Sequence, residues 1–254
     1  MRQKDKRALS RRGFMTQSAA AGISAVAAVA APPPAIAQYQ GAIPPWTRRF
    51  PSYVDAKTGA TIFNLTPGDH DDRIVYQTHP MWTQDMRYFM FYSTRSGDGA
   101  RPHLLDMNTG EARPVFAEGH QRETMTWRDN NFYCVVNHDV CVVDVIKRYH
   151  NEGELRVVGR IPEALQRYSG DITVDADGGA LYFGAQLDEA GEKYAVAAMN
   201  LASGETRIVV ETDFKVGHFQ ANPVKPGQIM FCWETGGDAP QRAWFVNADG
   251  SGLK

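Results

Sequence analysis

Three histidines in this sequence precede turn-like segments at similar distances. These are His79, His120 and His218, and glycines 119 and 217 stand directly before two of them. Imidazole ligates metals and hydrogen-bonds anions. If the three positions correspond in a repeated structure, they lie on one ring, where they could reach a metal ion or an anionic sugar. Repeats that are not neighbours would hold them too far apart for one ion, so single substrate contacts by His218 and His79 are the sharper hypothesis. The alternative is polar loop or core histidines satisfied by hydrogen bonds.

Arg242 is the strongest single candidate for ligand binding. A guanidinium group binds a carboxylate through two parallel hydrogen bonds, which predicts a role in holding an anionic substrate. The alternative is a solvated arginine on a strand. Gln220 follows His218 by two residues and could line the same face. A nucleotide-binding glycine loop, a Cys-x-x-Cys pair and a serine nucleophile elbow are all missing from the sequence.

The elements that must position these residues are short β-rich runs separated by turns. Four runs align on the turn residues Asp85, Asp129, Asp177 and Pro226. They recur about every 47 residues, and a period of 40–50 residues with several strands per unit is typical of β-propeller blades. Each blade is a small antiparallel sheet that buries its faces only against its neighbours. An open β-sandwich with accidental spacing is the alternative.

A second repeated mark is a strand that ends in a polar turn with glycine. Gly110, Gly204 and Gly250 occupy this place, and Gly59 has an earlier, related one. Glycine supplies the positive φ of a tight hairpin, and Asp or Asn caps the turn. Residues 146–167 do not fit the pattern, and they are expected to hold a short helix or a long connection.

Composition narrows the possible partners. The chain has 254 residues, a formal net charge of −2 and 11% aromatic residues. Because the chain has no excess of basic residues, it is not expected to bind nucleic acid. Hydrophobic residues make up 43%, which excludes a disordered tail.

Residues 1–37 are interpreted as an export signal and residues 38–254 as the folded domain. Basic residues precede the run Ser10 to Met15, whose paired arginines 11 and 12 resemble a twin-arginine signal. The Ala-rich stretch after it is too short to span a bilayer permanently, and residues 35–37 fit a small-x-small cleavage site. The sequence therefore predicts the twin-arginine export machinery as a partner and a periplasmic location. The alternative is an amphipathic N-terminal helix.

Two of the three cysteines flank a predicted hairpin. If Asn137 and His138 form a two-residue turn, Cys134 and Cys141 face each other across the strands. A disulfide is conceivable in the periplasm. Two buried thiols are the preferred interpretation, because proteins exported by this route fold before export in a reducing compartment.

The count of repeats suggests an incomplete propeller. About 217 residues follow the predicted signal, enough for four to five blades of the expected size. The last residues form a strand and its turn with no visible return strand, which would leave an edge unpaired. The sequence is therefore expected to be truncated at its C-terminal end.

Two stretches resemble the oligogalacturonate lyase family. Phe50 to Pro67 is similar to the family's opening segment, and Gly217 to Cys232 with Arg242 to Ser251 is similar to a mid-chain stretch. The resemblance implies a seven-bladed propeller that cleaves pectin-derived uronate oligosaccharides by β-elimination. It also implies Mn²⁺ as the cofactor, with Arg242 in the family's catalytic motif.

The same resemblance places the family's histidine base and its manganese ligands beyond residue 254. The resemblance therefore implies a lyase-like chain that is catalytically incomplete unless further blades follow. The competing hypothesis is a non-catalytic exported propeller that binds a glycan or a protein, since a fold alone does not settle function.

Overall fold

The computed structural model describes residues 45–97, 99–116, 119–126, 129–235 and 237–254. The predicted export signal, residues 1–37, lies outside the described residues, as do residues 127 and 128 of the second β-rich run. Everything described belongs to one compact unit. No helix in this part of the chain is long and apolar enough to cross a membrane.

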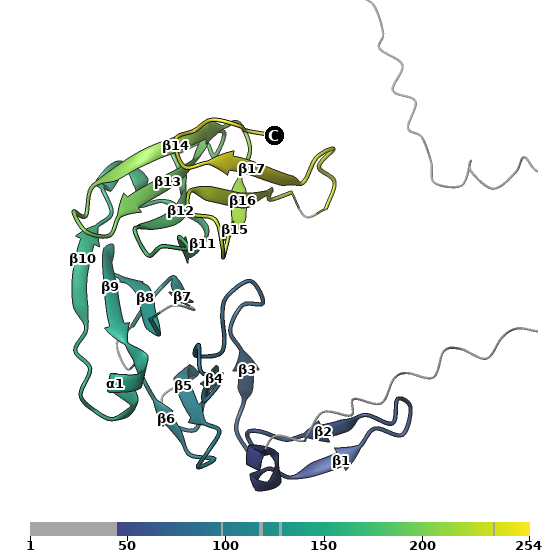
Figure 1. The fold of residues 1–254 in the computed structure, drawn as a ribbon. Coiled ribbons are helices and arrows are strands. Elements are labelled where there is room, and N and C mark those ends of the chain that lie inside the picture. The colour runs from purple at the N-terminus through teal and green to yellow at the C-terminus, as the bar shows by residue number, and fades with distance from the viewer. Residues whose placement is uncertain (1–44, 98, 117–118, 127–128, 236) are drawn as a thin grey trace, which may run out of the picture. The chain divides into compact units, whose positions relative to one another are not determined.

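Four antiparallel sheets follow one another along the chain, each a meander in which consecutive strands pair (Figure 1). We call them blades 1 to 4. Blade 1 comprises β3 (Asp72–Ile74), β4 (Tyr88–Ser93), β5 (Arg101–Asp106) and β6 (Ala112–Pro114). Blade 2 comprises β7 (Glu123–Met125), β8 (Asn131–Val136), β9 (Asp139–Asp144) and β10 (Arg156–Arg160). Blade 3 comprises β11 (Tyr168–Val174), β12 (Ala180–Gln186), β13 (Tyr194–Asn200) and β14 (Thr206–Thr212). Blade 4 comprises β15 (Val216–Ala221), β16 (Gln228–Trp233) and β17 (Ala243–Asn247).

The observed blades follow the predicted repeat. Asp85, Asp129, Asp177 and Pro226 each lie in the turn between the first and second strands of a blade. Gly110 and Gly204 lie between the third and fourth strands, and both have a φ of +75°. The prediction of an all-β propeller arrangement is confirmed, with four blades in the described residues.

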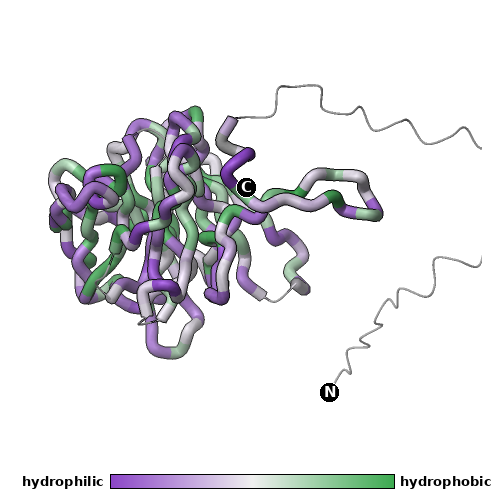
Figure 2. The backbone as a smooth tube through the Cα atoms, turned by 90° about the horizontal axis from the view of Figure 1, so that it is seen from below, coloured by the Kyte–Doolittle hydropathy of each residue, from purple (hydrophilic) through white to green (hydrophobic). Residues whose placement is uncertain are grey.

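The apolar cores lie between neighbouring blades rather than inside any one of them. One cluster joins Met90 and Leu104 of blade 1 to Phe132 of blade 2. A second joins blades 2 and 3, and a third joins blades 3 and 4. Figure 2 shows hydrophobic and hydrophilic segments alternating along the chain. The strands β4 of blade 1 and β13 of blade 3 are buried along nearly their whole length.

A two-stranded hairpin precedes blade 1. It consists of β1 (Ser52–Val54) and β2 (Thr61–Phe63), and a 3₁₀ turn, η2 (Pro45–Arg49), comes before it. Its strands are largely exposed, with Tyr53 at 63%. Phe50 and Leu65, which flank the hairpin, instead pack with Phe91 of blade 1. The segment is therefore anchored at its base and exposed along its strands.

The irregular stretch between β9 and β11 contains the predicted short helix. Asp144 caps α1 (Val145–Tyr149) by accepting hydrogen bonds from two backbone amides of the helix. β10 and a 3₁₀ turn, η3 (Glu163–Leu165), complete the connection.

The turn before β9 also forms as the sequence predicts. Asn137 and His138 have φ values of +49° and +70°, as a type I′ hairpin requires. Cys134 and Cys141 are direct cross-strand partners, and both are buried.

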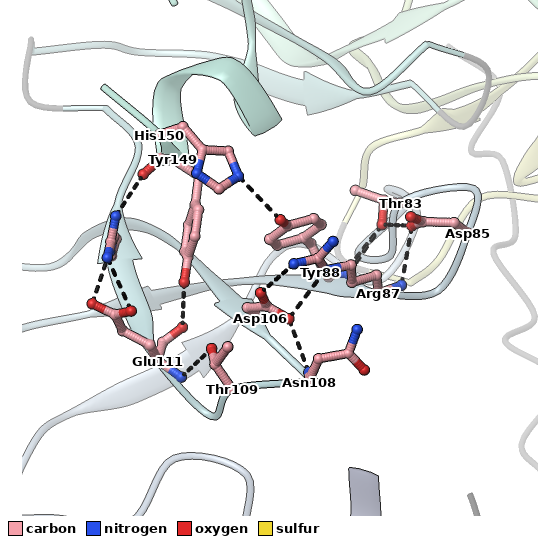
Figure 3. Close-up of polar contacts among 11 residues, drawn as sticks. Thr83, Asp85, Arg87, Tyr88, Asp106, Asn108, Thr109, Glu111, Tyr149 and His150 are labelled. Carbon is pink, nitrogen blue, oxygen red and sulfur yellow. Dashed lines mark hydrogen bonds and ion pairs between the residues drawn. The ribbon is translucent and has the colours of Figure 1, made fainter. Parts of the chain in front are cut away.

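Hydrogen bonds of polar side chains stabilise the turns of blade 1 and connect this blade to α1 (Figure 3). Arg87 donates two hydrogen bonds to the buried carboxylate of Asp106, at 2.9 and 3.3 Å. Burial alone would raise the pKa of Asp106, but hydrogen bonds from Arg87 and from following amides hold it below its usual value. Tyr149 of α1 donates to the backbone oxygen of Glu111 at 3.2 Å. These contacts fix the turns that end the strands of this blade.

Blade 4 continues past β17. After the turn at Gly250, the backbone of Lys254 both donates to and accepts from Phe245, at 3.1 and 2.8 Å. The residues after the turn thus begin to pair with β17, although no return strand is visible in the sequence.

Candidate functional site

His218 lies at an irregularity in β15, the first strand of blade 4. The pairing of β15 with β16 shifts register between Gly217 and Gln220, and His218 has a φ of +50°. A positive φ is uncommon for a residue with a side chain, and bulges re-aim side chains near functional sites. The backbone of this strand therefore gives His218 an orientation that regular pairing would not.

Both ring nitrogens of His218 are engaged. Nδ1 is hydrogen-bonded to the hydroxyl of Tyr76, and the two rings stack with centroids 5.4 Å apart. Nε2 lies 2.8 Å from Oε2 of Glu234. Tyr76 follows β3 of blade 1 and Glu234 follows β16 of blade 4, so these contacts join the first and last blades of the described chain.

Arg242 lies on the other side of the same carboxylate. Its Nη2 is 3.6 Å from Oε1 of Glu234, and its Nε donates to Sγ of Cys232 at 3.1 Å. Its backbone oxygen accepts a hydrogen bond from Trp233, which fixes the residue where β17 begins. The contacts with Cys232 and the negative charge of Glu234 raise the pKa of Arg242, and the side chain is 45% exposed. It is a permanent positive charge at the surface.

His79 lies beside this network and is buried, with 7% exposure. Its Nδ1 is 3.1 Å from the hydroxyl of Thr124, and its ring centroid is 6.0 Å from that of Tyr76. Burial lowers the pKa of His79, and the charge of Asp171 opposes this only in part. The described contacts of His79 are those of a neutral, hydrogen-bonded core histidine, and a substrate contact for it stays a prediction.

Gln220 faces a different region. It lines a cavity of about 550 Å³ together with residues from the other three blades, among them Gln77, Thr124, Thr173 and Asp175. His218, Glu234 and Arg242 are not part of that lining. The bulge in β15 thus separates Gln220 from His218, although the two are only two residues apart.

The third predicted histidine has a similar set of partners in another place. His120 Nε2 lies 3.3 Å from the hydroxyl of Tyr92 and 3.4 Å from Glu123. Here the tyrosine hydroxyl also donates directly to Glu123. Two Tyr–His–Glu clusters therefore occur in the described residues, and they differ in which of the three groups hydrogen-bond to one another.

Sequence reasoning missed Tyr76 and Glu234. Tyr76 stands three residues before His79, and Glu234 stands two residues after Cys232, where the stretch that begins with Gly217 ends. Neither position carries a motif of its own. Their importance arises only from the meeting of blades 1 and 4.

The described residues do not fit a manganese site. They contain no group of three or more His, Cys, Asp or Glu side chains placed to hold a metal ion. His218 and Glu234 bind each other directly. What the site offers instead is an exposed guanidinium for an anion and a phenol–imidazole–carboxylate chain that can move a proton.

No protein-family model matches the sequence, and no curated protein sequence matches it. Solved structures, in contrast, are similar to this chain. Oligogalacturonate lyase from Vibrio parahaemolyticus gives a TM-score of 0.70 at 20% identity, covering 81% of this chain and 58% of that one. An oligogalacturonate lyase in complex with manganese gives 0.68 at 22% identity with the same coverage. The chain therefore has the fold of these propellers and spans 58% of their length.

Proposed function

We propose that this chain is an oligogalacturonate lyase-like propeller that recognises uronate oligosaccharides, and that Arg242 binds the substrate carboxylate. The observation that carries the proposal is the position of Arg242, whose guanidinium is held by Glu234 and Cys232 and remains 45% exposed. A planar fork with a permanent charge matches a carboxylate in geometry and charge. The shared fold with oligogalacturonate lyases supports the choice of uronate over other anions.

The chemistry proposed for such a substrate is β-elimination. The proton on C5 lies next to the carboxylate, and its removal spreads negative charge onto the carboxylate oxygens. A guanidinium bound there stabilises this charge more strongly in the transition state than in the ground state. Arg242 would therefore contribute to binding and to the rate.

A second candidate is a propeller that binds a glycan without cleaving it. It is favoured by the donor set of the described residues, which supplies the exposed guanidinium of Arg242 without a group of three or more side chains placed to hold a metal ion. Both candidates share the recognition step and differ in turnover.

Recognition is tested by calorimetric titration of the chain with galacturonate oligomers and with neutral galactose oligomers. Selective binding of the charged oligomers is expected, and Arg242→Gln should weaken it by at least about tenfold, since charge-assisted hydrogen bonds contribute about 1.5–3 kcal/mol. Arg167→Gln is the matched control, because Arg167 is also about half exposed and pairs with Glu189 at 2.8 Å. Equal binding of both oligomers, or no effect of Arg242→Gln, contradicts the proposal.

Turnover separates the two candidates. Elimination produces an unsaturated uronate that absorbs in the ultraviolet. A rise in absorbance with galacturonate oligomers, measured with and without Mn²⁺, supports the lyase, whereas tight binding with constant absorbance supports the glycan-binding propeller.

We also propose export to the periplasm by the twin-arginine route. The supporting feature is the paired Arg11 and Arg12 with the small-residue stretch after them. Replacing both arginines by lysine should leave the protein in the cytoplasmic fraction with its signal uncleaved. Export of the double variant at the original level would contradict this route.

A further inference from the structure

We propose that His218 is a positioning residue that keeps the guanidinium of Arg242 free for a uronate carboxylate, because it binds Glu234 itself. The inference rests on the proposed function and deepens it, since it names what controls the affinity of the Arg242 site. Glu234 is a carboxylate of the chain beside that guanidinium, so it competes with the carboxylate of a substrate. His218 affects substrate binding only through this competitor.

The two oxygens of Glu234 have different partners at different distances. Oε2 lies 2.8 Å from Nε2 of His218, within hydrogen-bond distance. Oε1 lies 3.6 Å from Nη2 of Arg242, which makes an ion pair but is too long for a hydrogen bond. The guanidinium donates from Nε to Sγ of Cys232 at 3.1 Å, and its two Nη atoms donate to no side chain of the described residues. These two nitrogens are therefore available to an incoming carboxylate.

A second arginine pair in the chain shows the closed arrangement. Arg113 donates from Nε and Nη2 to the two oxygens of Glu111, at 2.8 and 3.0 Å. Its side chain is 39% exposed, close to the 45% of Arg242, so solvent exposure does not explain the difference between the pairs. What differs is that one oxygen of Glu234 is bound by an imidazole. We therefore attribute the open pair at Arg242 to His218.

His218 is held in place independently of Arg242. Its φ of +50° lies in the irregular part of β15, and its Nδ1 is hydrogen-bonded to the hydroxyl of Tyr76. The two rings also stack, with centroids 5.4 Å apart. A carboxylate only accepts hydrogen bonds, so Nε2 carries the proton that is donated to Glu234. The imidazole is thus fixed from blade 1 while it holds the carboxylate of blade 4.

Loss of the imidazole should let Glu234 close on the guanidinium. Both carboxylate oxygens could then accept hydrogen bonds from Arg242, as those of Glu111 do from Arg113. Because Glu234 belongs to the same chain, its effective concentration at the guanidinium is high, and a substrate would have to displace it. Exposed ion pairs are weak, so the affinity for a uronate should fall by about two- to fivefold.

His218→Asn tests the inference in calorimetric titrations with galacturonate oligomers. Asparagine tolerates the positive φ of this position and lacks the imidazole. We expect the affinity to fall by about two- to fivefold. His138→Asn is the matched control, because His138 also has a positive φ, of +70°, and its Nδ1 lies 2.5 Å from the hydroxyl of Tyr168. Its affinity should equal that of the original chain.

Glu234→Gln distinguishes competition from a merely structural role of the histidine. This variant removes the competing charge, so its affinity should equal or exceed that of the original chain. Adding His218→Asn to Glu234→Gln should then have no further effect. A histidine that only supports the fold would lower the affinity equally in both backgrounds. Circular dichroism shows whether each variant is folded.

Several results would overturn the inference and leave the recognition proposal standing. They are an unchanged affinity in folded His218→Asn, or an equal loss with and without Glu234→Gln. If His218→Asn does not fold, Glu234→Gln decides alone, because an affinity below that of the original chain would show that Glu234 supports the site. Absence of oligomer binding by the original chain, or binding that Arg242→Gln does not weaken, overturns the proposed function and the inference with it.

Discussion

Asp175, at the end of β11, accepts hydrogen bonds from the backbone amide of Gly227 at 2.9 and 3.0 Å. Gly227 lies in the first turn of blade 4, so one carboxylate of blade 3 holds the neighbouring blade in place. The same carboxylate accepts the hydroxyl of Tyr182 at 2.7 Å, and it is only 8% exposed. This contact occurs in the turn region that carries the blade repeat.

Asp175→Ala should destabilise the protein by about 2–4 kcal/mol, because it leaves a buried hydroxyl and a backbone amide without an acceptor. Equilibrium urea denaturation measures the change. Asp177→Ala is the control, since Asp177 is exposed and accepts only a local hydrogen bond from Gly179. Equal losses in the two variants would show that the link between blades is unimportant.

The close approach of blades 3 and 4 depends on a small residue at position 184. A Cβ atom on Gly184 would overlap the backbone oxygen of Ser169 and lie 2.8 Å from the ring of Phe219. Gly184→Ala is therefore expected to cost at least about 1–3 kcal/mol through overpacking. Gly119→Ala, where a Cβ would meet nothing within 4 Å, should be close to neutral in the same urea titration. A neutral Gly184→Ala would contradict the close approach.

The repeat could be predicted from sequence because its signals are local. Asp85 and Asp129 mark turns through side chains that accept hydrogen bonds from nearby backbone amides, at Arg87 and Asn131. Gly110 has a positive φ of +75°, which glycine adopts without steric cost. Such features act over a few residues, so they can be read without knowing the fold.

The site could be predicted only in part. Arg242 and His218 were found through residue type and resemblance, and the structure connects both to Glu234. Tyr76 could not be found, because it stands 142 residues from His218 in the sequence. Only the arrangement of four blades brings them into contact. It could not be predicted either that Gln220 and His218 face different regions, because this depends on an irregularity within one strand.

Stability should depend on pH through His79. Burial lowers the pKa of His79 in the folded protein. As the pH falls through about 6.5, the ordinary value for histidine, the unfolded chain takes up a proton that the folded chain does not. The free energy of unfolding should therefore be greatest above this pH, decrease below it, and level off once the folded pKa is passed.

His79→Gln should reduce this slope in urea titrations between pH 7 and pH 5. Some slope is expected to remain, because burial also lowers the pKa of His103. A slope that is unchanged in His79→Gln would show that His79 titrates alike in both states.

The left-handed backbone of His218 predicts an order among substitutions that differ in shape. Asn adopts positive φ more readily than other residues with side chains, whereas a β-branched residue is strongly disfavoured there. His218→Val should therefore be less stable than His218→Asn by about 1–2 kcal/mol, the cost of the left-handed conformation. Thermal and urea unfolding of the two variants measure the difference, and both variants lose the imidazole, so the comparison isolates the backbone. Equal stability of the two variants would mean that β15 can relax into regular pairing. The bulge would then not be required to hold His218 between Tyr76 and Glu234.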